Sequence, residues 1–143
     1  MKPTPIELAG AEGNRLAADL WDGRGHPVVL LHGGGQTRRA WDTTASRIAD
    51  NGMRAITVDL RGHGESDWVA SGDYTFDAYG RDAAAIVRQV AERYHAAPSA
   101  VGASLGGLSA LIAETRFGPL LDSLVLVDVT PRMDPDGVAK IQG

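Results

Sequence analysis

Short apolar runs alternate with polar, glycine-rich segments along the chain. The clearest runs cover residues 28–31, 55–58 and 123–128, and each has the length of one strand. A run that is apolar at every position, rather than at alternate positions, is typical of a strand buried on both faces of a sheet. We therefore predict three buried strands here. Shorter strands are expected at 5–9 and 15–21, joined as a hairpin, and a further one at 99–101.

Helical spacing of apolar residues fills the gaps between these runs. The pattern predicts helices at 38–50, from a Thr75 cap to about residue 94, and at 105–117, where Gly118-Pro119 ends the last one. Strands that alternate with helices in this way predict an α/β fold with a mostly parallel sheet and helices on both faces. Such sheets bind their ligands at the carboxyl ends of the strands.

Composition narrows the class of protein. The 143 residues suffice for one domain, and 43% apolar with 22% charged residues is typical of a globular protein. With no cysteine, disulfides, thiolate metal sites and cysteine nucleophiles are excluded. A net charge of -4 argues against a nucleic acid partner. Neither a signal peptide nor a membrane-spanning run is evident, so we expect a cytoplasmic protein without a membrane partner.

The segment Gly102-Ala103-Ser104-Leu105-Gly106 is the best candidate for chemistry. It lies between a predicted strand and a predicted helix, where a sharp turn would project Ser104 into solvent. Such a turn strains the serine backbone and requires small neighbours, which Gly102 and Gly106 supply. The start of the following helix would place the Leu105 amide where an oxyanion forms. We therefore predict that Ser104 is a catalytic nucleophile.

Three more segments share a pattern with one known family. They are Leu30-Leu31-His32-Gly33-Gly34-Gly35, Asp59-Leu60-Arg61-Gly62-His63-Gly64-Glu65-Ser66 and Leu126-Val127-Asp128. With the Ser104 motif, they make the chain resemble the N-terminal portion of the α/β-hydrolase superfamily, in particular its serine-nucleophile esterase, lactonase and haloperoxidase-like members. The resemblance implies that the Gly34 amide is the second oxyanion donor. Gln36 or Trp41 would line the pocket, although we expect Trp41 in the helix core instead. It also implies that no cofactor or metal is needed.

The histidines do not complete the expected triad. The superfamily order is Ser, then acid, then His, yet all four histidines precede Ser104. We expect His32 and His63 to pack or hydrogen-bond in the glycine-rich loops, and His26 and His95 to lie on the surface. The acid remains open, because some family members carry it at the end of the sixth strand, where Asp128 stands. Asp128 would otherwise simply end that strand.

These observations predict the N-terminal part of a hydrolase core over residues 1–131, with a cap or linker beginning at 132–143. The sheet would stop after about its sixth strand and expose an edge. We expect a fragment of a longer enzyme, inactive alone, in which Ser104 forms an acyl-enzyme with a small ester, lactone or thioester. The alternative is a non-catalytic binding protein or an inactive half-domain. The oligomeric state is open.

Two rival interpretations use the same loops. Gly33, Gly35 and Asp59 also fit a dinucleotide-binding layout, but the third small residue of that fingerprint would fall at Arg38. The alternating His63, Glu65 and Asp67 could suggest metal ligands. The family resemblance accounts for that segment better, so we expect no metal site.

Overall fold

The computed structural model describes residues 2–127 of the chain. Within them lie six strands, three α-helices and one short 3-10 helix, η1. In chain order they are β1 (Thr4–Ala9), β2 (Arg15–Asp22), β3 (Pro27–Leu31), η1 (Arg38–Trp41), α1 (Asp42–Asp50), β4 (Arg54–Val58), α2 (Phe76–Tyr94), β5 (Ser99–Ala103), α3 (Leu105–Phe117) and β6 (Ser123–Val127).

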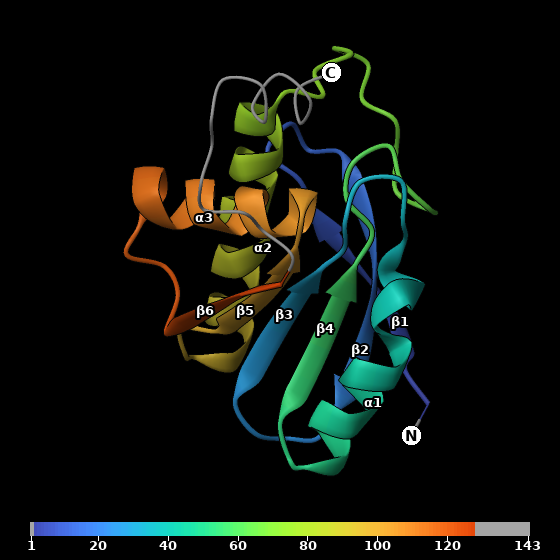
Figure 1. The fold of residues 1–143 in the computed structure, drawn as a ribbon, viewed down its shortest axis with the longest axis vertical. Helices are drawn as coiled ribbons and strands as arrows, with labels where there is room; N and C mark the ends of the chain where they lie inside the picture. Colours follow the sequence, from blue (N-terminus) through green and yellow to red (C-terminus); the bar gives the residue numbers. More distant parts are fainter. Residues whose placement is uncertain (1, 128–143) are drawn as a thin grey trace.

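The six strands form one sheet in the order β1-β2-β4-β3-β5-β6 (Figure 1). The hairpin of β1 and β2 is antiparallel, and β2 also pairs antiparallel with β4. The remaining pairs, β4–β3, β3–β5 and β5–β6, are parallel. The predicted α/β architecture with a mostly parallel sheet is confirmed. Its carboxyl edge gathers the loops that follow β3, β4 and β5.

Helices cover both faces of the sheet, with α1 on one side and α2 and α3 on the other (Figure 1). Alternate residues of each strand serve the two layers. Val29 and Leu31 of β3 join the larger cluster under α2 and α3, whereas Val28 and Leu30 join the smaller cluster under α1. All four are at least 94% buried, which explains why β3 is apolar at every position.

The helix predicted at 38–50 differs at its start. Residues 38–41 form η1, and the α-helix begins only at Asp42. Arg38 is not on a solvated helix face, because its side chain is only 6% exposed and pairs with Asp19 and Asp59. These ion pairs draw the first turn toward the sheet, which explains the departure from the helical pattern.

The prediction that residues 123–128 form a fully buried strand is wrong for the described part. In β6, Val125 is 51% exposed, and Leu126 and Val127 are 38% and 37% exposed. One edge of β6 pairs with β5, but no strand within residues 2–127 pairs with its other edge. Asp128 and the expected cap or linker at 132–143 lie outside the described residues. Among residues 2–127, no helix has the length and apolar character to cross a membrane.

Candidate active site

Ser104 occupies a strained turn between β5 and α3. Its backbone angles are φ 51° and ψ -115°, outside the regions that non-glycine residues favour. The turn is possible because its neighbours lack side chains. A Cβ on Gly102 would lie 2.5 Å from the Gly107 Cα, and one on Gly106 would lie 2.1 Å from the Leu31 carbonyl oxygen. The Ser104 residue is exposed as a result.

The loop after β3 lies directly beside this turn, because β3 and β5 are parallel neighbours. A Cβ on Gly33 would lie 3.5 Å from the Ser104 Cβ. A Cβ on Gly34 would lie 3.8 Å from the Leu105 Cδ2. The two residues predicted to supply oxyanion amides, Gly34 and Leu105, are therefore neighbours at the mouth of the Ser104 turn.

His32 fixes the peptide group that carries the Gly34 amide. Its Nδ1 donates to the Gly33 carbonyl oxygen at 2.7 Å, and its Nε2 accepts from the Leu60 amide at 3.0 Å. The carbonyl and N–H of a trans peptide point in opposite directions, so the Gly34 N–H points away from His32. The Gln36 Oε1 holds the other side of Gly33, accepting its N–H at 3.0 Å. Burial lowers the pKa of His32, which keeps the ring neutral and able to accept.

None of the four histidines offers a free base nitrogen to Ser104. Both ring nitrogens of His32 bind backbone groups, and His63 is engaged in the same way. His26 is half-buried and contacts Ser99 at the amino end of β5, the far end of that strand from Ser104. His95 is exposed and caps the C-terminal end of α2. His26 keeps a side chain that is 36% exposed, so it lies at the surface as predicted, with its ring against Ser99.

The geometry of Asp59 disfavours dinucleotide binding. Its side chain is fully buried and accepts from the Arg38 N and Nη1 at 2.6 and 2.5 Å and from the Glu65 N at 2.9 Å. A carboxylate engaged in this way is not free to bind a ribose. Burial alone would lower the pKa of Arg38, but hydrogen bonds to Glu65 and Asp19 raise it, so the guanidinium stays charged.

The alternating acidic residues of the same loop do not gather around one point. Glu65 pairs with Arg38, and Asp67 accepts from the Arg15 backbone at 3.0 Å. Throughout residues 2–127, no group of three or more histidine or acidic side chains is placed to hold a metal ion.

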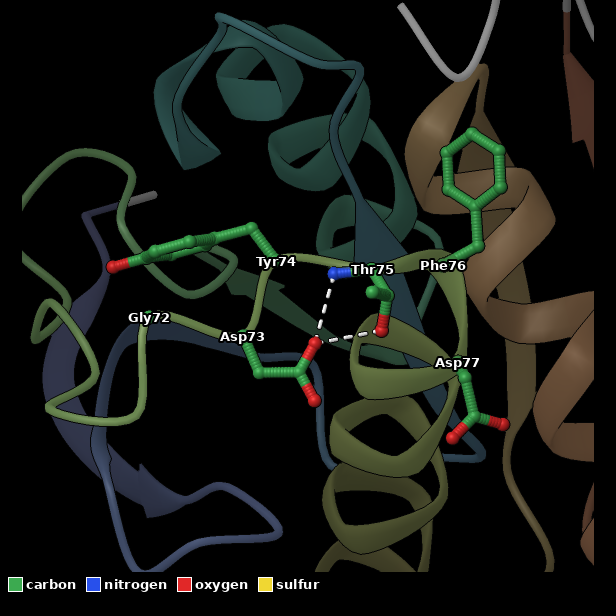
Figure 2. Close-up of a pocket in the computed structure, with 6 residues that line it drawn as sticks. All are labelled: Gly72, Asp73, Tyr74, Thr75, Phe76 and Asp77. Carbon is green, nitrogen blue, oxygen red and sulfur yellow. Dashed lines mark hydrogen bonds between the residues drawn. The ribbon is translucent and has the colours of Figure 1, made fainter. Parts of the chain in front are cut away.

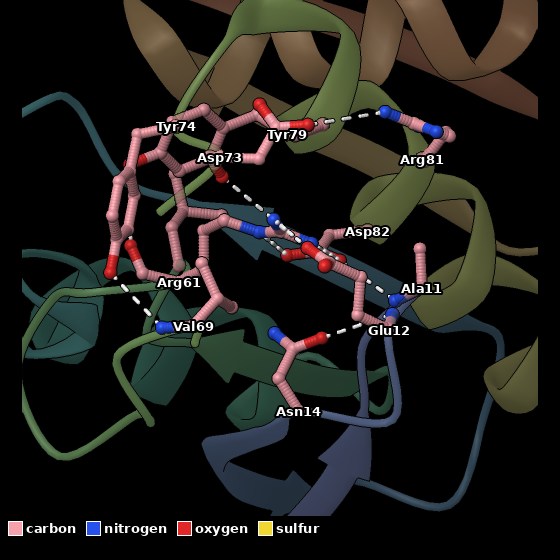
Figure 3. Close-up of polar contacts among 12 residues, drawn as sticks. Ala11, Glu12, Asn14, Arg61, Val69, Asp73, Tyr74, Tyr79, Arg81 and Asp82 are labelled. Atoms are coloured by element: carbon pink, nitrogen blue, oxygen red, sulfur yellow. Dashed lines mark hydrogen bonds and ion pairs between the residues drawn. The ribbon is translucent and has the colours of Figure 1, made fainter. Parts of the chain in front are cut away.

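Arg61 anchors the loop after β4 (Figure 3). Its side chain is fully buried, with Nε and Nη2 each donating to the Asp82 carboxylate at 2.7 Å. Its Nη1 donates to Glu12 at 2.6 Å and to the Asp73 carbonyl at 2.8 Å. The hydrogen bonds to Asp82 raise the pKa of Arg61 above its ordinary value, so the buried guanidinium stays charged. The Arg61 carbonyl in turn accepts from the Tyr79 hydroxyl at 3.2 Å.

A cavity of about 520 Å³ lies at the start of α2, lined by residues 72–77 (Figure 2). Of its two acidic side chains, Asp73 and Asp77, the first turns toward Thr75 and accepts from the Thr75 hydroxyl at 2.7 Å and from the Thr75 amide at 3.1 Å. The hydroxyl contact lowers the pKa of Asp73. Among residues 2–127, none of those predicted for the active site lines this cavity.

The expectation that His32 and His63 hydrogen-bond within the glycine-rich loops is confirmed, although the sequence did not name Leu60 and Gly35 as their partners. The Gln36 contact to Gly33 and the Arg61–Asp82 pair were not predicted. A usable signal was present for the bond between His63 and Gly35. Glycine-rich loops with a histidine follow two strands that a parallel α/β sheet can bring together, and backbone amides left by glycines need acceptors.

An α/β sheet with a serine at a strained strand-to-helix turn, beside a glycine-rich loop, defines a hydrolase-type architecture. Residues 28–142 match the alpha/beta hydrolase family, and the chain belongs to this family. The resemblance deduced from the sequence is confirmed.

Individual relatives agree with this assignment. An esterase from Mycobacterium tuberculosis is 39% identical over 129 residues, covering 90% of this chain and 41% of the relative. A non-heme chloroperoxidase from Kitasatospora aureofaciens is 32% identical over 81% of this chain and 43% of its own length. The structure of a thermophilic esterase from Thermogutta terrifontis superposes with a TM-score of 0.78 at 28% identity, covering 93% and 48% of the two chains. The chain thus spans less than half the length of each of these relatives.

Proposed function

We propose that Ser104 is the nucleophile of a serine hydrolase that cleaves esters or related carbonyl compounds. The observation that carries this proposal is the strained, exposed Ser104 turn at the carboxyl edge of the sheet. Strain at a non-glycine residue costs about 1–3 kcal/mol and persists where function requires it. A serine held there by glycine packing on both sides is well suited to attack a bound substrate.

The reaction follows from the neighbours of Ser104. Its Oγ attacks the carbonyl carbon, and the hydroxyl proton passes to a base while the carbonyl oxygen becomes an oxyanion. The amides of Gly34 and Leu105 hold this oxyanion, each donor contributing about 3 kcal/mol. The base returns the proton to the leaving group. Water then attacks the acyl carbon as the same base takes its proton, and the base returns this proton to the Ser104 Oγ as the bond between the acyl group and Oγ breaks and the acid leaves. This sequence of steps needs no cofactor or metal.

We assign the base to a histidine outside these 143 residues. His32 and His63 are bound by backbone groups. His26 contacts Ser99 at the other end of β5, and His95 caps the C-terminal end of α2. The short span of the chain relative to its curated relatives supports this assignment. The acid is assigned to the same missing part, with Asp128 as the alternative.

A small-molecule substrate with an ester, lactone or thioester group fits this mechanism. A serine hydroxyl forms a covalent ester intermediate with a carbonyl substrate, so Ser104 favours acyl chemistry. One relative is named as an esterase, which supports an ester substrate for this chain.

Labelling with a fluorophosphonate probe tests the proposal directly in the full-length protein. We expect labelling of the parent and of Ser71→Ala, a control that removes an exposed serine elsewhere, and no labelling of Ser104→Ala. The 143-residue chain alone should hydrolyse p-nitrophenyl acetate no faster than its Ser104→Ala variant, because it lacks the base. A full-length protein that resists the probe would indicate a non-catalytic binding protein instead.

A further inference from the structure

Two histidine side chains make reciprocal hydrogen bonds between the loops after β3 and β4. His32, in the first loop, accepts the Leu60 amide of the second at 3.0 Å. His63, in the second loop, accepts the Gly35 amide of the first at 3.0 Å. Each ring donates its Nδ1 proton to a carbonyl of its own loop. The centroids of the two rings are 5.0 Å apart, so the His32 and His63 bonds form one unit that joins the two loops.

This unit fixes the backbone on both sides of Gly34. The peptide group before Gly34 is held at its carbonyl by His32, and the peptide group after Gly34 is held at its N–H by His63. Three successive glycines would otherwise leave this segment with wide conformational freedom, and Gly35 already adopts φ 78°. Oxyanion stabilisation depends on donors that are oriented before the reaction begins.

We propose that His63 is a positioning residue that orients the Gly34 amide for the oxyanion. This inference rests on the proposed function of the site. His63 suits the task because it is itself anchored: its Nδ1 donates at 3.0 Å to the Arg61 carbonyl, which also accepts the Tyr79 hydroxyl. Figure 3 shows the anchor, in which the Arg61 side chain is fixed by Asp82. The α2 helix thereby supports the loop beside Ser104.

A matched pair of variants in the full-length protein separates the two ends of the ring. In His63→Gln, the side-chain oxygen can take the place of Nε2 and still accept from Gly35. In His63→Asn, the amide can replace Nδ1 at the Arg61 carbonyl but does not reach Gly35. We expect His63→Asn to lower kcat about three- to ten-fold, with KM changed less than about two-fold, because one orienting hydrogen bond is lost. His63→Gln should stay within about two-fold of the parent.

A spectroscopic signature tests the contact independently of activity. In ¹⁵N-labelled parent protein, the Gly35 N–H···Nε2 bond should give a scalar coupling between the two nitrogens across the hydrogen bond. The Leu60 to His32 bond should give a coupling of the same kind and serves as the internal control. Retention of this control coupling in His63→Asn shows that the loops remain folded.

The outcomes are distinct. Equal kcat values for the Asn and Gln variants, or no Gly35 coupling while the Leu60 coupling is present, would overturn the role of His63. A parent protein with no Ser104-dependent activity would overturn the proposed function instead. In that case the Gly35 coupling still decides whether His63 holds the loop.

Discussion

Replacing Arg61 with methionine should be among the most destabilising single changes in the molecule. The Arg61 side chain is 0% exposed and its partner Asp82 is 1% exposed. Methionine fills much of the same volume but removes the positive charge. Among residues 2–127, the buried Asp82 carboxylate then keeps the Ala11 amide, at 2.8 Å, as its one donor. Breaking a buried ion pair in this way costs about 3–5 kcal/mol. Because a typical domain is stable by only about 5–15 kcal/mol, the loss is large.

Arg81→Met is the matched control. Arg81 also pairs with two carboxylates, those of Asp73 and Asp77 at 3.4 and 3.0 Å, but its side chain is 48% exposed. Exposed pairs contribute about 0–1 kcal/mol, so this variant should lose little. A double variant, Arg61→Met with Asp82→Leu, should recover part of the loss, because it leaves no unpaired charge in the interior.

Urea unfolding at pH 7, followed by the fluorescence of the three tryptophans, gives the free energy of unfolding of each protein. The four proteins are the parent, Arg61→Met, Arg81→Met and the double variant. The reasoning would be refuted if Arg61→Met and Arg81→Met differed by less than about 1 kcal/mol. It would also fail if the double variant were no more stable than Arg61→Met alone, since the penalty is attributed to the unpaired Asp82.

Two further predictions concern the loops of the candidate site. Gly106→Ala should lower the free energy of unfolding by more than about 2 kcal/mol, because its Cβ would lie 2.1 Å from the carbonyl oxygen of Leu31. In Gly34→Ala, the nearest contact of the new Cβ within residues 2–127 would be the Leu105 Cδ2 at 3.8 Å, so the change should be less than about 0.5 kcal/mol. Similar urea midpoints for the two variants would contradict this. Because burial lowers the pKa of His32 below 6.5, the unfolded chain binds its proton first as the pH falls, so stability should fall below pH 6.5 with a slope of at most about 1.4 kcal/mol per pH unit from this group. His32→Gln should lose less stability than the parent between pH 7 and 5.5 in urea titrations, and equal losses would show that His32 is not responsible.

Much of the architecture could be predicted because local and global preferences agree. The run at β3 is apolar at every position, and both sets of alternate residues find a helical layer to pack against. The strained turn at Ser104 was also predictable, because only small residues allow β5 and α3 to approach so closely. In both cases the physical requirement acts on neighbouring residues, where a sequence pattern is visible.

The remaining features depend on partners distant in the sequence. An arginine such as Arg38 normally lies in solvent, and nothing near it indicates that Asp19 and Asp59 will enclose it. The exposure of β6 has a similar origin, because an apolar strand has the same pattern whether or not another segment covers it. Predicting which backbone amides His32 and His63 bind would have required the knowledge that β3 and β4 are adjacent and in register.

The backbone of Ser104 sets stability against chemistry at a single position. Glycine adopts φ 51° without the penalty that serine incurs, so a chain selected only for folding would drift toward glycine there. Directed evolution of this protein for heat tolerance would therefore tend to erase the hydroxyl group unless each round also screened for turnover. In a set of natural variants, retention of serine at this position would be a record of selection for catalysis rather than for the fold.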